Sequence, residues 1–168
     1  MTFKFLGEPI LVTGCNGFLG GYLLNNLVSI IDDSPELESQ ANIVAIDNGI
    51  TASNKIPKRD YITYFDENLI GFEFARLKPI KTILHLAGLA SPAQYKKYPL
   101  ETIDVAVNVT RRLLDKSKDW NSKFIFFSSS EIYGNPDADN IPTKESYKGY
   151  VSCQGPRACY DESKRMGE

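Results

Sequence analysis

The chain has 168 residues, of which 42% are hydrophobic and 24% charged, and its formal net charge is −2. This composition is ordinary for a globular domain and excludes a disordered tail, a collagen-like chain and a coiled coil. The nearly balanced charge gives no electrostatic reason to bind nucleic acid or an anionic membrane, so neither is expected as a partner.

A buried strand is expected at residues 10–13, followed by a glycine turn and an amphipathic helix at 18–31. The turn reads GCNGFLG and places Gly14, Gly17 and Gly20 between strand and helix. Glycines at such a turn allow the backbone to approach a pyrophosphate closely, and the helix N-terminus favours the phosphates. The alternative is a glycine-rich turn that packs without a ligand.

Residues 32–40 are expected to form a loop and residues 42–46 a second strand. Asp47 and Asn48 follow that strand directly. A carboxylate at this place can accept hydrogen bonds from both hydroxyls of an adenosine ribose and would repel a 2′-phosphate, which favours NAD over NADP. The alternative is an ordinary surface turn of sequence DNG.

The next expected elements are a weak strand at 61–65, a helix at 67–78, a strand at 82–86, a helix at 100–117 and a strand at 124–127. Short apolar strands that alternate with longer amphipathic segments indicate a parallel sheet covered on both faces. The predicted fold class is α/β, a Rossmann-type doubly wound parallel sheet.

Polar residues follow the last strand. Ser129 lies in the segment SSSEIYG at 128–134, at the carboxyl end of the strand, where parallel sheets bind ligands. After a loop at 135–155, Tyr160 and Lys164 share one face of a helix. A neighbouring ammonium favours a phenolate, which makes a tyrosine a usable proton acceptor. The alternatives are a strand-ending turn for the serines and a solvated surface pair for Tyr160 and Lys164.

The cysteines, the histidine and the first residues indicate a cytoplasmic protein without a metal site. The three cysteines form no CxxC pair and His85 is the only histidine, so neither a disulfide framework nor a zinc site is expected. Residues 1–8 lack the apolar segment of a signal peptide, and no apolar run is long enough to span a bilayer.

Five motifs together resemble the extended short-chain dehydrogenase/reductase family, the NAD-dependent nucleotide-sugar epimerases, dehydratases and decarboxylases. They are GxxGFLG at 14–20, DN at 47–48, HLA at 85–87, SSEIYG at 129–134 and YxxxK at 160–164. Within the family, HLAGLASPAQY at 85–95 and GPRACYDESKR at 155–165 are most similar to the UDP-glucuronate decarboxylases.

The resemblance implies a chemistry in which NAD is the cofactor and a UDP-sugar the substrate. NAD oxidises the sugar at C4 while Tyr160 takes the hydroxyl proton, Lys164 holds the nicotinamide ribose, and Ser129 bonds the C4 oxygen. The 4-keto sugar then makes loss of a C5 carboxylate feasible. Glu131, a like charge beside a uronate, would aid that loss.

The site residues are completed from the same resemblance. The cofactor-binding residues are Gly14, Asn16, Gly17, Phe18, Leu19, Gly20, Asp47, Asn48, Leu86, Ala87, Tyr160 and Lys164. The substrate-binding residues are Tyr95, Ser130 and Arg157, of which Arg157 would clamp an anion. Alternatively, Arg157 opens the helix or pairs with Glu131 or Asp161. His85 is expected to be structural and Cys159 to serve packing.

A few positions discriminate between the reactions that occur in this family. Ser130 and Glu131 favour a decarboxylase, because 4,6-dehydratases carry Asp-Glu there. Against it stand Asp104, where decarboxylases usually carry a lysine, and Ala106 and Val109, which replace the Asn and Gly of an Asn-x-x-Gly-Thr element. Decarboxylation of UDP-glucuronate is the first hypothesis, and a 4-epimerase or 4,6-dehydratase is the alternative. A non-catalytic NAD-binding module or an inactive fragment is the alternative of another class.

Family members are considerably longer and carry a small substrate lobe after the tyrosine helix. The resemblance therefore implies that residues 1–168 are an NAD-binding Rossmann domain, truncated before that lobe. A homodimer is expected for the full-length relative.

Overall fold

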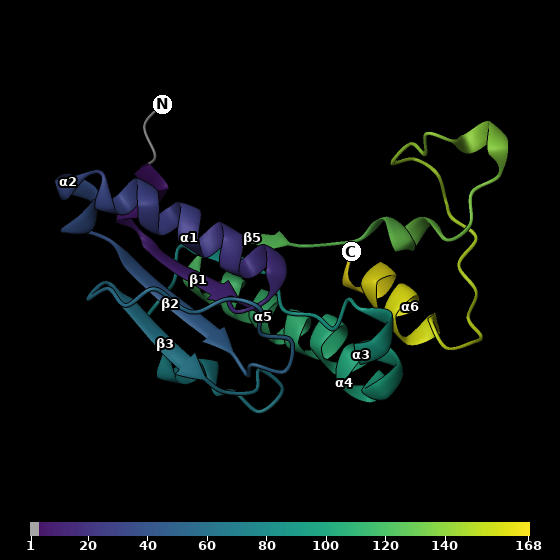
Figure 1. Cartoon of the computed structure of the whole chain (residues 1–168), viewed down its shortest axis with the longest axis horizontal. Helices are drawn as coiled ribbons and strands as arrows, with labels where there is room; N and C mark the ends of the chain where they lie inside the picture. Colours follow the sequence, from purple (N-terminus) through teal and green to yellow (C-terminus); the bar gives the residue numbers. More distant parts are fainter. Residues whose placement is uncertain (1–3) are drawn as a thin grey trace. The chain divides into compact units, whose positions relative to one another are not determined.

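The computed structural model describes residues 4–168 and contains a five-stranded, all-parallel sheet (Figure 1). The strands are β1 (Pro9–Thr13), β2 (Asn42–Asp47), β3 (Ile62–Asp66), β4 (Thr82–His85) and β5 (Lys123–Phe126). Their order is β3-β2-β1-β4-β5, so the predicted α/β, Rossmann-type fold is confirmed. The expected lack of a signal peptide at residues 1–8 lies partly outside the described residues.

The sheet reverses its strand order at β1, which pairs with β2 on one side and β4 on the other. Right-handed connections then place the helix between β1 and β2 on one face and the helix between β4 and β5 on the opposite face. These helices are α1 (Phe18–Asp32) and α5 (Thr110–Trp120). In such sheets, ligands bind outside the carboxyl ends of the strands at the reversal point.

The chain forms two compact units. Unit 1 comprises the residues up to Ala87 together with Arg111–Phe127, and it holds the whole sheet. Unit 2 comprises Gly88–Thr110 and Ser128–Glu168. The expectation of a single Rossmann domain over the whole chain stays a prediction.

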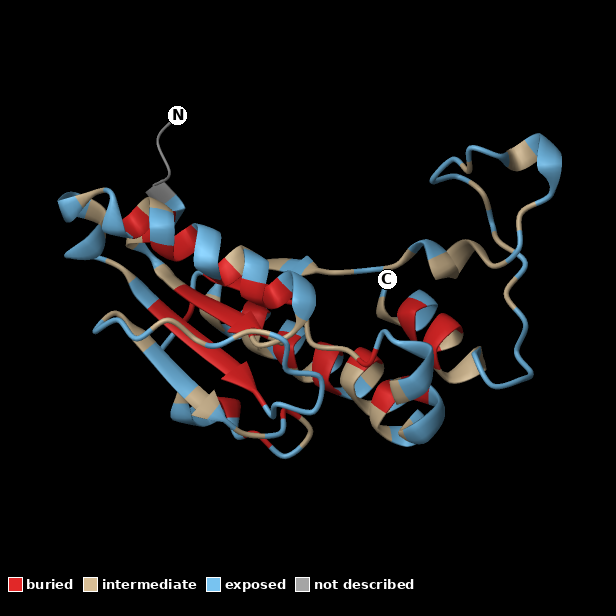
Figure 2. Cartoon of the chain, viewed as in Figure 1, coloured by how far each residue is buried: buried red, intermediate tan, exposed pale blue. Residues whose placement is uncertain are grey.

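The core of unit 1 lies between α1 and the central strands. In β1, Ile10, Leu11 and Val12 are fully buried. Figure 2 shows the same burial along β1, β2 and α1. The buried apolar residues of α1 recur at helical spacing and are Leu24, Leu27, Val28 and Ile31.

His85 is the last residue of β4. Its Nδ1 lies 2.7 Å from the Thr13 hydroxyl oxygen, and its ring lies about equally far from Phe124 and Phe126. The side chain is fully buried. This environment agrees with the structural role expected from the sequence.

The prediction of a helix at 67–78 is wrong. That segment contains only a single 3₁₀ turn, η2 (Phe74–Arg76). The guanidinium of Arg112 in α5 donates hydrogen bonds to the carbonyl oxygens of Leu69, Ile70 and Phe72. A distant side chain therefore takes bonds that a helix would give to its own amides, although the Leu69 carbonyl also accepts the Phe72 N–H at 3.3 Å.

Two short elements of unit 1 were not expected. They are a 3₁₀ turn, η1 (Lys4–Gly7), and one turn of α-helix, α2 (Pro35–Glu38), inside the expected loop at 32–40. Pro35 occupies the first helical position of α2, where its missing N–H is not needed.

Unit 2 is built of short helical elements. They are α3 (Pro92–Lys97), α4 (Pro99–Ile103), the π-helical stretch η3 (Asp104–Val109), the 3₁₀ turns η4 (Ser130–Tyr133) and η5 (Ala138–Asn140), and α6 (Ala158–Gly167). The helix expected at 100–117 is thus present, but it is interrupted by a π stretch before α5 begins. Such π stretches are frequent at functional sites.

No helix in the part of the chain that the structure describes has the length and apolar character needed to cross a membrane.

Neighbouring leucines of α5 provide a test of the unit 1 core. Leu113 is fully buried, whereas Leu114 is 45% exposed. We expect Leu113→Ala to lower the free energy of unfolding by about 2–5 kcal/mol, because it leaves a cavity. The matched Leu114→Ala should cost less than about 1 kcal/mol in urea denaturation. Equal losses would contradict the described packing.

Candidate functional site

The turn after β1 requires glycine at two positions because other backbone atoms lie too close. Gly14 has a φ of +73°, and a Cβ there would lie 2.6 Å from the Ala87 nitrogen. A Cβ on Gly20 would lie 1.9 Å from the Gly14 carbonyl oxygen. No side chain fits at either position, so the glycine spacing has the packing reason expected of a phosphate loop.

The start of α1 is open to a ligand. Gly17 is its N-cap, and no side chain caps the first N–H groups. Phe18 and Leu19, in the first turn, are exposed. Uncapped N–H groups at a helix N-terminus form a binding site for phosphate oxygens. These features fit the pyrophosphate of a dinucleotide.

Asp47, at the end of β2, is held by the backbone of the same region. Its Oδ2 accepts a hydrogen bond from the Asn16 N–H at 2.9 Å, and its Oδ1 accepts one from the Gly49 N–H at 2.8 Å. A carboxylate has about four lone-pair sites, so two remain for ribose hydroxyls. The neighbouring Asn48 is exposed and accepts a bond from the Ile50 N–H.

The backbone that leaves β4 borders the phosphate loop. The Leu86 N–H donates to the Thr13 carbonyl at 3.1 Å, and the Ala87 N–H lies 3.4 Å from the Thr13 hydroxyl oxygen. Both predicted cofactor residues therefore lie beside the turn that holds Gly14, within unit 1.

Sequence reasoning missed a segment that clasps the phosphate loop. The backbone amides of Ser53 and Asn54 both donate to the Asn16 carbonyl, and the Asn54 side chain donates to the Gly17 carbonyl at 2.9 Å. The Asn16 side chain donates to the Tyr64 hydroxyl at 3.0 Å. No local pattern signals these contacts, because they join residues more than 30 positions apart.

In unit 2, Tyr160 and Lys164 are buried on α6, with only 7% and 5% of their surface exposed. The alternative of a solvated surface pair is therefore wrong. Burial lowers the pKa of Lys164 to about 8, because desolvation disfavours the ammonium. A Cβ on Gly88 would lie 3.6 Å from the Lys164 Nζ, so this glycine borders the amine closely.

The Tyr160 ring stacks on Tyr95 from α3. The ring centroids are 5.3 Å apart and the planes meet at 13°. The two rings form a small apolar cluster with Leu89, on which Tyr98 and Cys159 also pack. The Cys159 thiol points to the Tyr95 carbonyl oxygen at 3.6 Å, which agrees with a packing role for this cysteine.

Ser129 caps the 3₁₀ turn η4, where its hydroxyl oxygen accepts a hydrogen bond from the Glu131 N–H at 3.2 Å. A local backbone bond of this kind is what the alternative of a strand-ending turn predicts for the serines. It uses one lone pair and leaves the hydroxyl proton free to be donated to a substrate oxygen. Ser130, in the same turn, is exposed.

Arg157 precedes α6 and makes two ion pairs. Its Nη2 contacts the Glu131 carboxylate, and its Nε lies 3.4 Å from the Asp161 Oδ2. Both pairings that the sequence left open for this side chain are present. These carboxylates raise the pKa of the Arg157 guanidinium, with Asp161 as the larger cause.

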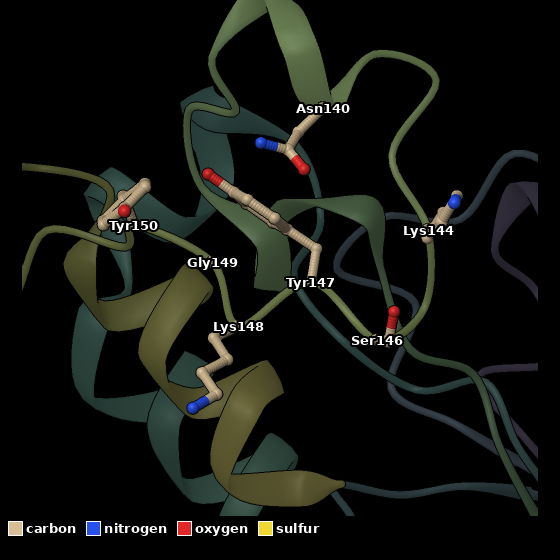
Figure 3. Close-up of a pocket in the computed structure, with 7 residues that line it drawn as sticks. All are labelled: Asn140, Lys144, Ser146, Tyr147, Lys148, Gly149 and Tyr150. Atoms are coloured by element: carbon tan, nitrogen blue, oxygen red, sulfur yellow. The ribbon is translucent and has the colours of Figure 1, made fainter.

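The long loop before α6 encloses a hollow of about 400 Å³ (Figure 3). A backbone bridge between Gly134 and Tyr150 closes this part of the loop. The lining residues are Asn140, Lys144, Ser146, Tyr147, Lys148, Gly149 and Tyr150. Figure 3 shows Lys144 and Lys148 extending away from each other, so the hollow does not bring their charges together. Within residues 4–168 no cluster of acidic, histidine or cysteine side chains could hold a metal ion.

Comparison with known proteins gives one family. The model of the NAD dependent epimerase/dehydratase family matches residues 10–168. UDP-glucuronic acid decarboxylase 1 of Danio rerio is 33% identical over 98% of this chain and 38% of its own length. Its Arabidopsis thaliana counterpart is 35% identical over 95% of the chain and 34% of its own length. The chain thus spans little more than a third of these relatives.

Two solved structures of nucleotide-sugar enzymes superpose on this chain. UDP-N-acetylglucosamine 4-epimerase from Methanobrevibacter ruminantium M1, in complex with UDP-N-acetylmuramic acid, superposes with a TM-score of 0.75 at 28% identity. The match covers 96% of this chain and 48% of that one. The NAD-dependent NDP-hexosamine 5,6-dehydratase TunA gives a TM-score of 0.71 at 25% identity, over 95% and 48% of the two chains.

The glycine contacts predict a graded effect of two substitutions. Gly20→Ala should lower the free energy of unfolding by about 1–3 kcal/mol, since the new methyl group would meet the Gly14 carbonyl. Gly17→Ala is the control, because its Cβ would lie 3.3 Å from the same oxygen. Urea denaturation measures both. A smaller loss for Gly20→Ala than for Gly17→Ala would contradict the close contact.

Burial of Lys164 predicts a pH dependence of stability. Its ordinary pKa of 10.5 applies in the unfolded chain, and the folded value is about 8. Between these values the unfolded chain binds a proton that the folded chain lacks, so the free energy of unfolding rises with pH. We therefore expect the free energy of unfolding of the wild type, relative to that of Lys164→Met, to rise as the pH rises from about 8 to 10.5. Urea denaturation at several pH values in this interval measures both proteins. A difference that is independent of pH would contradict it.

Proposed function

The chain belongs to the NAD dependent epimerase/dehydratase family, and from this membership we propose that it converts a UDP-sugar through a 4-keto intermediate. The specific reaction that we propose is the decarboxylation of UDP-glucuronate to UDP-xylose. Identity of 33–35% to decarboxylases over nearly the whole chain supports this choice within the family.

The observation that carries the proposal is the joint burial of Tyr160 and Lys164 on one face of α6. A lysine is rarely buried without a function, because desolvation of its ammonium costs free energy. With a pKa of about 8, Lys164 still carries its proton in most molecules at neutral pH. A buried lysine one helical turn from a buried tyrosine, on the same helix face, supports a tyrosine that accepts and returns a proton.

NAD fits the residues of unit 1. Gly14, Gly17 and the open start of α1 would hold its pyrophosphate, and Asp47 would hold the adenosine ribose. When bound, NAD supplies a reversible two-electron oxidant for a sugar carbinol. The remaining cofactor residues, Phe18, Leu19, Asn48, Leu86 and Ala87, border the same turn and strand ends.

The side chains of unit 2 would then act on the sugar. Tyr160 takes the proton of the C4 hydroxyl as the C4 carbonyl forms, and the Ser129 hydroxyl donates a hydrogen bond to that oxygen. The bond from C5 to the carboxylate then breaks, carbon dioxide leaves, and the electron pair moves into the C4 carbonyl as an enolate. C5 takes a proton from solvent. Because the oxidation at C4 is reversible, the carbonyl is then reduced back to the alcohol while Tyr160 returns its proton to the C4 oxygen. Glu131 places a negative charge near the sugar carboxylate, which raises the free energy of the bound substrate and favours this loss.

A 4-epimerase is the second candidate, supported by the epimerase among the structural relatives. Asp104, which stands where decarboxylases usually carry a lysine, accepts a hydrogen bond from the Asn108 side chain at 2.6 Å. An acidic residue there suits an uncharged sugar better than a uronate. Binding of the substrate by Tyr95 and Ser130, a homodimer and a cytoplasmic location stay predictions of the resemblance.

The test is mass spectrometry of the products formed from UDP-glucuronate and NAD. We expect loss of carbon dioxide with the wild type and none with Tyr160→Phe, which lacks the phenol oxygen that moves the proton. Calorimetry of NAD binding tests the cofactor site separately, and Asp47→Ala should weaken the affinity for NAD. An unchanged UDP-glucuronate with interconversion of UDP-glucose and UDP-galactose, separated by chromatography because the epimers have equal mass, would favour the epimerase. NAD binding without turnover of any UDP-sugar would indicate a binding module.

A further inference from the structure

Arg157 joins two segments of unit 2 that carry predicted catalytic residues. Glu131 lies in η4, two residues after Ser129, and Asp161 lies on α6, next to Tyr160. The guanidinium contacts the carboxylates of both Glu131 and Asp161. Different nitrogen atoms make the two contacts, so one side chain bridges both segments.

The two contacts differ in environment. The Asp161 side chain is 12% exposed, whereas Glu131 is 39% and Arg157 49% exposed. Asp161 is therefore the fixed end of the bridge and Glu131 the end that faces solvent. Because a guanidinium is planar and presents its N–H donors in a rigid fork, fixing Nε also fixes the direction of Nη2.

The backbone of Arg157 belongs to the same arrangement. Its carbonyl oxygen accepts hydrogen bonds from the N–H groups of Tyr160, at 2.9 Å, and Asp161, at 3.1 Å. The residue that contacts Glu131 thus also forms the first turn of the helix that carries Tyr160. Displacement of the Glu131 carboxylate relative to this turn is limited by one side chain.

The charges argue against the anion clamp expected for Arg157. One guanidinium between two carboxylates gives a group with a net negative charge. A sugar carboxylate or phosphate that approached the guanidinium would meet the two carboxylates already paired with it, and this repulsion disfavours binding. Exposed ion pairs contribute little to stability, so the bridge adds little to folding. Its geometric effect on Glu131 remains.

We propose that Arg157 is a positioning residue, anchored by Asp161, that holds the Glu131 carboxylate in place relative to Tyr160. The proposal rests on the proposed function, in which Glu131 acts on the sugar carboxylate. It assigns Arg157 to the enzyme's own carboxylate and not to the substrate.

The first experiment reads the bridge without any turnover. In proton–nitrogen NMR spectra of the arginine side chains, paired guanidinium groups give shifted signals because their rotation is restricted. We expect such signals from Arg157 in the wild type and their loss in Glu131→Gln. Arg165, an exposed arginine on α6 with no ion pair among the described residues, is the control and should not change. Arg157 signals that are insensitive to Glu131→Gln would overturn the proposal.

The second experiment is a kinetic cycle with Arg157→Gln, Glu131→Gln and the double variant. We expect Arg157→Gln to lower kcat by about 10- to 100-fold with little change in KM, as for a misplaced reacting group. The double variant should be no slower than Glu131→Gln, because Arg157 acts through that carboxylate. Arg157→Lys should recover part of kcat, and Arg165→Gln should match the wild type.

A substrate clamp would give a different result. Arg157→Gln would then raise KM, and its effect would multiply with that of Glu131→Gln, either of which overturns the positioning role. If the wild type turns over no UDP-sugar, the proposed function fails, and the NMR result alone decides whether Arg157 holds Glu131.

Discussion

The close contact between Gly14 and Gly20 is the constraint on which the cofactor half of the chain depends. A Cβ on Gly20 would lie 1.9 Å from the Gly14 oxygen, and one on Gly14 would lie 2.6 Å from the Ala87 nitrogen. Only because both side chains are absent can α1 begin directly after β1 with β4 beside it. Gly17, the N-cap of α1, has no side chain, so the first N–H groups of α1 are uncapped and open to the phosphates of the proposed cofactor.

In unit 2 the corresponding constraint is the burial of a charge. Lys164 loses most of its hydration on α6, and its pKa falls to about 8 as a result. A protein that only needed a helix at this place would bury an apolar residue at lower cost. Tyr95 stacks on the Tyr160 ring, and the Arg157 guanidinium links the start of α6 to Glu131. Together these contacts limit the motion of Tyr160 and Glu131, two of the groups proposed to act on the sugar.

Sequence reasoning was most successful where the signal is local. The strands that flank Gly14 and Asp47 have continuous apolar runs, and all five expected strands are present. It was wrong at 67–78, where Arg112, about 40 residues away, takes the carbonyl bonds that a helix would need. The π stretch at Asp104–Val109 and the clasp of Asn54 on the phosphate loop also had no local signal. Each depends on partners that only the folded chain brings together.

The sequence by itself determined the parallel sheet, the glycine turn, the position of Asp47 after β2 and the common helix face of Tyr160 and Lys164. These follow from periodicity and spacing, which act over a few residues. Only the tertiary structure decided that Tyr160 and Lys164 are buried and not solvated, and that the Arg157 guanidinium is paired with Glu131 and Asp161. Burial and ion pairing depend on which distant segments approach a side chain, and spacing along the chain carries no information about that approach.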